Sequence, residues 1–400
     1  MSIIQINKKA PVTNTFSLFN LGFRPFFLGA SVLASISIGM WMSVYFSHIS
    51  LPLTVLSIFQ WHSHEMIYGY SVAVIAGFLL TAIQNWTGVQ TIQGRSLLAL
   101  FSLWSLARVL FLFGTRFLEI AALADMLFML CLLVAVATPI VKAKQWKQLG
   151  VLSKVLLLML GNLSFYLGAF GLLENGPYWG IYGGLYAIIA LILTIGARVI
   201  PAFIRNGVDN YVEVKNPLWL NVASLILFLA FFINQLFIRN QALLGYLSIA
   251  LCLITSARLW LWHTPGIWRK PLLWSLFLSI VFIDFGFVLY ALSAFAGVSP
   301  FLAVHAFAFG GIGLATLGMM SRVVLGHTGR NIRNPPAMTT YALLLLTIGA
   351  VTRVGLPLVD QTHYANWIFL SQILWIAAFV LFVITYSKML VQPRIDGQEG

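Results

Sequence analysis

Two histidines and a glutamate stand together in an apolar part of the chain, in the run Trp61–Met66, which reads Trp-His-Ser-His-Glu-Met. The 400 residues include only seven histidines and ten acids, and 60% of the chain is hydrophobic. Ionisable side chains at membrane depth are costly and mark cofactor sites, ion pathways or proton relays. An imidazole can ligate a metal or carry a proton near neutral pH. We therefore treat this run as a candidate site and ask which residues complete it.

The composition predicts that the chain lies in a membrane. Its mean hydropathy is +0.94 and 8% of its residues are charged, whereas a soluble domain has roughly 25%. We expect an all-α polytopic membrane protein with about twelve transmembrane helices. The predicted spans are 26–46, 60–84, 96–114, 119–140, 152–173, 178–203, 217–238, 241–262, 271–295, 301–325, 339–358 and 364–390. They form one domain over 26–390, between an interfacial amino terminus (1–25) and a tail (391–400).

The basic residues predict the orientation of the helices. If the amino terminus is cytoplasmic, all but four of the 23 Lys and Arg residues fall on the cytoplasmic side. The four outer residues are Arg108, Arg116, Arg239 and Arg353. Because basic segments stay on the cytoplasmic side, both termini are predicted to lie there. The net charge of +13 is thereby explained by topology, and nucleic acid is not an expected partner.

Three histidines share one depth in this topology. His62 and His64 lie near the outer end of the second helix, and His305 lies near the outer end of the tenth. Two residues apart on a helix, His62 and His64 point to nearly opposite faces, so only one of them is expected to work with His305. By helical spacing, Glu65 shares a face with His62, and Tyr68 shares a face with His64.

These positions suit a haem between two helices, held by one axial histidine from each side. The predicted ligands are His305 with either His62 or His64, and Glu65 and Tyr68 would orient ligands or move protons. Glycines at 69, 77, 310, 311 and 313 would make room for a flat macrocycle. The alternative is that the glycines serve close helix packing and each histidine bonds a neighbour.

A weak repeat relates helices 2, 6 and 10. They end in Asn85-Trp86-Thr-Gly, Arg-Asn-Gly and His327-Thr-Gly, with the glycines 119 and 122 residues apart. Arg198 and Arg322 also correspond. Such weak symmetry is typical of membrane proteins with internal repeats. It predicts three four-helix units about a pseudo-threefold axis, unless the glycine-containing turns match by chance.

Other charged residues lie outside this proposed haem site and have structural or topological interpretations. Arg108 and Asp125 share a depth on adjacent helices and predict an ion pair. Asp284 lies mid-span, either protonated against a polar partner or on a proton path. Arg24, before Pro25, indicates an interfacial start for the first helix. A last set gathers at the cytoplasmic ends and would form an anion-binding cluster or simply serve as topological charge: Arg198, Arg205, Arg322, His327 and Arg330.

Several motifs in collinear order resemble the signature of the NnrS family. They are residues 22–27 (Gly-Phe-Arg-Pro-Phe-Phe), 61–66, 77–88, 198–203, 305–313 and 319–330. The resemblance implies a multi-pass protein of the bacterial inner membrane, tied to nitric oxide metabolism and nitrosative stress and holding haem and copper. One position departs from the family pattern: Phe277 stands where the ninth helix commonly carries a histidine. Because copper favours imidazole ligands, haem is the better supported cofactor.

A more distant similarity is to the catalytic subunit of haem–copper oxidases and nitric oxide reductases. There, helices 2 and 10 supply both axial ligands of a haem, and helices 6 and 7 supply copper ligands. Helices 6 and 7 of this chain contain no histidine, which disfavours a dinuclear centre. We therefore predict an NnrS-type haem protein that contacts membrane lipid and is involved in nitric oxide metabolism or the nitrosative-stress response, with nitric oxide or a small redox partner as its expected partner. The alternatives are a secondary transporter of a small solute, without a redox cofactor, and a cofactor-free structural or sensor protein.

Overall fold

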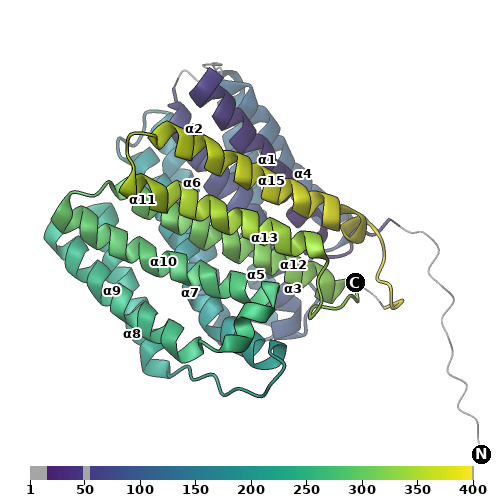
Figure 1. The fold of residues 1–400 in the computed structure, drawn as a ribbon. Coiled ribbons are helices and arrows are strands. Elements are labelled where there is room, and N and C mark those ends of the chain that lie inside the picture. The colour runs from purple at the N-terminus through teal and green to yellow at the C-terminus, as the bar shows by residue number, and fades with distance from the viewer. Residues whose placement is uncertain (1–15, 48–54, 399–400) are drawn as a thin grey trace, which may run out of the picture.

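The computed structural model describes residues 16–47 and 55–398, and within these ranges the chain is helical, with no β-strand (Figure 1). Twelve helical spans of the described chain are long and apolar enough to cross a membrane. This confirms the predicted class, an all-α protein that passes the membrane many times. The amino-terminal prediction for residues 1–15 lies outside the described residues.

The first six spans form an antiparallel series. They are α1 (Phe23–Ser47); α2 (Ile58–His64) continued by the π-helix η1 (Glu65–Ser71) and α3 (Val72–Thr87); α4 (Gly94–Leu112); α5 (Leu118–Lys142); α6 (Leu149–Ala169); and α7 (Gly176–Gly207). Short 3-10 turns, η2 (Gly114–Phe117) and η3 (Trp146–Gln148), join neighbouring spans.

The other six spans follow the same plan. They are α8 (Leu218–Ile233) with the π-helix η4 (Asn234–Ile238); α9 (Gln241–Trp262); α10 (Pro271–Ala296); α11 (Pro300–His305) with the π-helix η6 (Ala306–Ile312) and α12 (Gly313–His327); α13 (Ala337–Ala350) with the π-helix η7 (Val351–Gly355) and α14 (Leu356–Val359); and α15 (Tyr364–Val391). The 3-10 turn η5 (Pro265–Arg269) precedes α10.

Local sequence signals explain where the second span begins and ends. Ser57 caps α2: its hydroxyl accepts from the Gln60 amide (3.2 Å), and the Gln60 side chain accepts from the Ser57 amide (2.8 Å). This reciprocal capping box satisfies two amides that the helix leaves free. At the other end, Gly88 adopts the left-handed conformation (φ 70°) that stops a helix. The span is therefore longer at both ends than the predicted 60–84.

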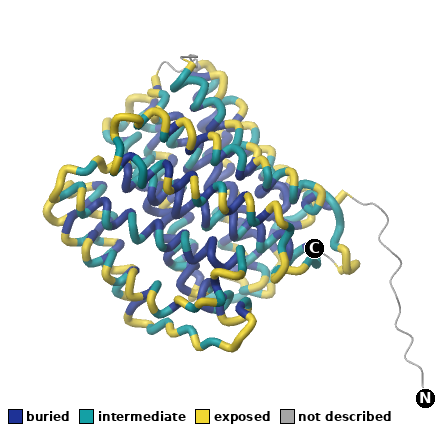
Figure 2. Tube along the Cα trace, in the orientation of Figure 1, coloured by how far each residue is buried: buried dark blue, intermediate teal, exposed yellow. Residues whose placement is uncertain are grey.

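Four spans form the centre of the bundle. Between 61% and 83% of the residues in the most apolar windows of α2–α3, α7, α10 and α11–α12 are buried, against 28% for α8–η4. Figure 2 shows the buried trace in the middle of the molecule and the exposed residues around it. Three of these central spans are the second, sixth and tenth, which the sequence repeat related to one another. The pseudo-threefold arrangement itself stays a prediction.

Both described ends of the chain lie on the same side. The Ser17 amide donates to the Val391 carbonyl (2.9 Å), and the buried Arg24 guanidinium donates to the carbonyls of Leu390 (2.9 Å) and Gln392 (2.7 Å). Arg24 therefore does more than mark an interfacial start: it caps the end of α15, whose last carbonyls have no helical partner. Placement of both ends in the cytoplasm stays a prediction.

Candidate functional site

A cavity of about 380 Å³ lies among α1, α2, α7, α11 and α15. Most of its wall is apolar or aromatic, and its polar side chains include two of the three predicted histidines, His62 and His305. Arg353, from η7, also lines the cavity, and uncharged polar side chains such as Ser63, Ser371 and Gln372 belong to the wall as well. A concave, mostly apolar pocket with a few convergent polar groups is the usual form of a small-molecule site.

Three π-helical segments contribute to this cavity. Residues of η1 and η6 line it, and η7 supplies Arg353. In both η1 and η6 the π-helix begins directly after a histidine, His64 and His305 respectively. Inserted π turns in α-helices occur frequently at functional sites.

The glycines of helices 2 and 10 do not widen this cavity, so that prediction is wrong. None of the five lines it. A Cβ atom would lie 2.8 Å from Phe27 at Gly77 and 2.9 Å from Trp375 at Gly313, and one at Gly310 would collide with Phe282. These positions are glycine because neighbouring helices pack directly against the backbone.

His62 lines the cavity and has a buried ring nitrogen without a partner among the described residues. Its ring stacks on Trp41, with ring centroids 4.7 Å apart and planes inclined by 19°. Its Nδ1 atom is buried and has no hydrogen-bond partner among the described residues. A buried polar atom without a partner is rare and calls for an explanation.

His305 is held in a defined tautomer. Its Nδ1 atom lies 2.7 Å from the Phe301 carbonyl, which only accepts, so Nδ1 carries the proton. Its Nε2 atom accepts from Arg353 Nη2 at 3.1 Å. The second terminal nitrogen of Arg353, Nη1, is buried without a partner in the described chain. His305 Nε2 and Arg353 Nη2 are thus joined by a hydrogen bond at the cavity wall, and Arg353 Nη1 remains without a partner there.

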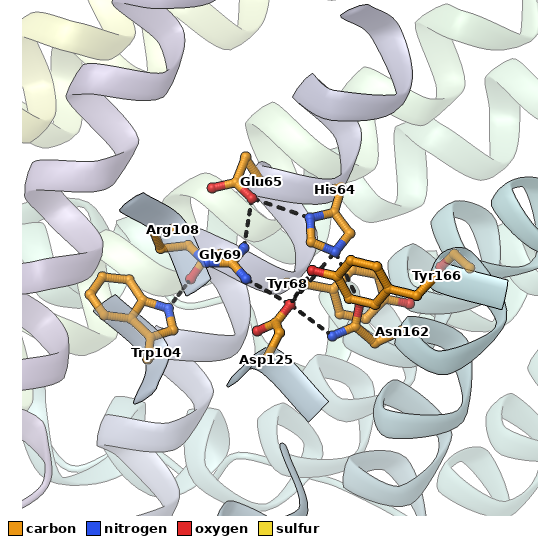
Figure 3. Close-up of polar contacts among 10 residues, drawn as sticks. His64, Glu65, Tyr68, Gly69, Trp104, Arg108, Asp125, Asn162 and Tyr166 are labelled. Atoms are coloured by element: carbon orange, nitrogen blue, oxygen red, sulfur yellow. Dashed lines mark hydrogen bonds and ion pairs between the residues drawn. The ribbon is translucent and has the colours of Figure 1, made fainter. Parts of the chain in front are cut away.

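His64 lies in a different environment, a closed polar network (Figure 3). Its Nδ1 atom faces Glu65 Oε1 (3.2 Å) and its Nε2 atom faces Asn162 Oδ1 (3.0 Å). The Asn162 amide nitrogen donates to Asp125 Oδ2 (3.0 Å), which fixes the orientation of that amide. Both ring nitrogens of His64 therefore have an oxygen atom within hydrogen-bond distance.

Arg108 joins the two carboxylates of this network. It lies 2.6 Å from Glu65 Oε1 and 2.6 Å from Asp125 Oδ2, which confirms the predicted Arg108–Asp125 ion pair. One guanidinium thereby contacts both buried carboxylates, and this contact matters because an unpaired buried charge is very costly.

Glu65 and Tyr68 both lie on the His64 side, so the grouping of Glu65 with His62 is wrong. Glu65 is three residues from His62 and one from His64, and the helix alone lets it turn either way. The contact with Arg108, on α4, places the Glu65 carboxylate on the His64 side. Tyr68 was correctly grouped with His64, and its hydroxyl donates to the Gly180 carbonyl (2.6 Å).

The predicted cytoplasmic cluster is divided among three places. Arg198 donates to Gln148 Oε1 (2.8 Å) and lies over Trp86, while Asn85 is exposed. His327 packs against Phe23. Only Arg322 and Arg330 line a common hollow, where Lys270 and Arg333 join them. A single anion-binding cluster of the predicted composition is therefore wrong.

Two further predicted positions lie away from the cavity. Ser256 donates to Asp284 Oδ2 at 2.6 Å, so this acid has the polar partner that one interpretation required. Phe277 packs near His263, with ring centroids 6.0 Å apart, rather than near the cavity histidines. In the part of the chain that the structure describes, no three His, Cys, Asp or Glu side chains gather closely enough to hold a metal ion.

Sequence reasoning missed Arg353 as a partner of His305. Its signal was its position, since it is one of only four basic residues assigned to the outer side. Trp41 was also missed, because nothing in an apolar helix marks which aromatic residue will stack on a histidine.

Twelve spans of the described chain that are long and apolar enough to cross a membrane define a multi-pass helical membrane protein, and the cavity lined by His62, His305 and Arg353 is its candidate site. The family model described as NnrS protein matches residues 17–394. The chain therefore belongs to the NnrS family, which is tied to the response to nitric oxide. A comparison with curated proteins finds no match. The distant similarity to haem–copper oxidases stays a prediction.

Proposed function

We propose that this protein binds haem in the cavity between α2 and α11 and serves in nitric oxide metabolism or the nitrosative-stress response. His62 and His305 would hold the haem iron. The observation that carries the proposal is that both imidazoles line one apolar cavity, whereas His64 does not.

The donor atoms fit this group. His62 Nδ1 is buried without a partner among the described residues, and the tautomer of His305 leaves a lone pair on Nε2. Arg353, which contacts His305 Nε2 and whose Nη1 atom is buried without a partner among the described residues, would hold a carboxylate of the haem.

The bound iron would supply the site at which nitric oxide coordinates. The chain itself would hold the ligands in place: the Phe301 carbonyl orients His305, and Trp41 orients His62. Such outer partners fix the tautomer and the ring orientation of a metal ligand. Copper is not part of the proposal, because the cavity offers only two imidazoles.

The test is the pyridine haemochrome spectrum of protein purified after expression with ample haem. We expect a Soret band in the wild type and its loss in His305→Ala. His263→Ala is the matched control, since His263 lies at the far end of α9 and should leave haem content unchanged. Absence of haem from the wild type would overturn the proposal.

A second candidate, a transporter of a small anion, is favoured by the buried donor of Arg353 and by the interrupted helices around the cavity. Haem-free protein in liposomes would then take up a labelled anion such as nitrite. Arg353→Gln should abolish that uptake, and uptake equal to that of empty liposomes would exclude this function.

A further inference from the structure

A second hollow lies at the opposite end of the bundle from the histidine cavity. Its volume is about 380 Å³, and its wall comes from the end of α7, the start of α10, the end of α12 and the loop after α12. Four cations line it: Lys270, Arg322, Arg330 and Arg333. We propose that this hollow binds a phosphate group, carried by an anionic lipid headgroup or by free phosphate.

Arg322 is the central cation. Its guanidinium stacks on Phe203 at 3.8 Å from the ring centroid, which fixes its plane. No carboxylate of the described chain lies within ion-pair distance of it or of Arg330. A planar guanidinium held in place and lacking a counter-ion is suited to bidentate phosphate binding.

The loop after α12 is folded so that it keeps its cations at the hollow. The Asn331 side chain accepts from the Arg333 amide (2.8 Å). The Arg333 guanidinium donates to the Asn206 carbonyl at the end of α7 (3.3 Å). Two segments more than a hundred residues apart are thereby joined across the hollow.

Among the described residues, one carboxylate forms an ion pair with these four cations. Lys270 Nζ lies 2.9 Å from Asp209 Oδ1, and the hydrogen bond from Lys270 holds the pKa of Asp209 below its usual range. Asp209 therefore stays charged at neutral pH and neutralises one cation, and three remain. The amino-terminal end of the 26-residue helix α10, at Pro271–Leu273, adds its positive dipole end to the same wall.

Basic residues that only set the orientation of the helices in the membrane need not line a common hollow as these four cations do. Arg205 and Arg269 lie at the same end of the bundle, are exposed and do not line the hollow. Basic residues that only set orientation need no shared cavity and no fixed guanidinium plane. These two arginines therefore provide a control with the same change in charge.

The test compares the double variants Arg322→Gln/Arg330→Gln and Arg205→Gln/Arg269→Gln, each as the full chain in detergent. Native mass spectrometry would measure binding of phosphatidylglycerol and cardiolipin, and a thermal shift would measure binding of inorganic phosphate. We expect the first variant to bind at least about tenfold more weakly, roughly 1.4 kcal/mol, and the second to match the wild type. Size-exclusion profiles and haem content would show that both variants fold.

The two probes distinguish the sources of the phosphate. Binding of lipid but not of inorganic phosphate assigns a headgroup, and binding of inorganic phosphate without lipid assigns the free anion. Equal losses in both double variants would show general electrostatic attraction and overturn the proposal. Failure of the wild type to bind either probe would also overturn it.

Discussion

His62 and His64 are two residues apart on α2, yet they lie in opposite kinds of environment. His62 borders a cavity and keeps a buried nitrogen without a partner among the described residues. His64 has an acceptor at each ring nitrogen and is packed between Phe111 and Phe165. One environment is open to a ligand and the other is complete. The difference teaches that residue type and depth do not by themselves distinguish the two histidines. What distinguishes them is whether a ring nitrogen lacks a hydrogen-bond partner.

The complete network should be the more costly to break. Arg108→Met removes the guanidinium that contacts the buried carboxylates of both Glu65 and Asp125, and we expect a loss of about 3–5 kcal/mol in unfolding free energy. Denaturant unfolding in detergent would measure it. Arg116→Met is the control, because Arg116 is exposed at the α4–α5 turn and should change stability little. Equal unfolding free energies of the two variants would show that the contacts of Arg108 with the two carboxylates do not stabilise the protein.

Under the proposed function, substitution of a histidine that lines the cavity should change the haem content of the protein. His62→Gln should lower the haem bound per mole of protein by about tenfold, ~1.4 kcal/mol, because it removes one of the two proposed haem ligands. His64→Gln should keep haem within about twofold of the wild type, although it lowers stability. Haemochrome quantitation of both variants, beside an unfolding measurement, separates the two roles. Loss of haem in His64→Gln alone would reverse the assignment.

An ion pair between Asp360 and His363, outside the buried network, should give the smallest effect. Asp360 accepts from His363 Nδ1 (2.8 Å), and this hydrogen bond lowers the pKa of Asp360 to about 2. Because the folded pKa lies below the unfolded one, the stabilisation is complete above about pH 4 and is lost as pH falls toward 2.

Carbon-13 NMR of the Asp360 carboxyl would follow this titration. In His363→Ala the midpoint should move up toward the ordinary value of Asp, with little change in overall stability. A midpoint near 4 in the unaltered protein would contradict the prediction.

Much of the fold could be predicted because hydropathy acts over whole segments. Twenty or so apolar residues must cross the bilayer as a helix, since lipid offers their amides no partners. The twelve predicted spans therefore agree with the structure within a few residues at most ends, and the NnrS motifs lie on them. The Arg108–Asp125 pair was also predictable, because two charges at one depth on adjacent helices have few other ways to be neutralised.

The sequence by itself determined the number of spans, the separation of His62 from His64, and the shared depth of both with His305. Helical periodicity and chain length impose these features. The tertiary structure decided which partners each side chain meets. Arg108 contacts Glu65 and places it on the His64 side, and Arg353, from η7, donates to His305. Neighbouring side chains pack directly on the glycines, which therefore do not line the cavity. These outcomes depend on which helix faces lie together, and no single helix carries that information.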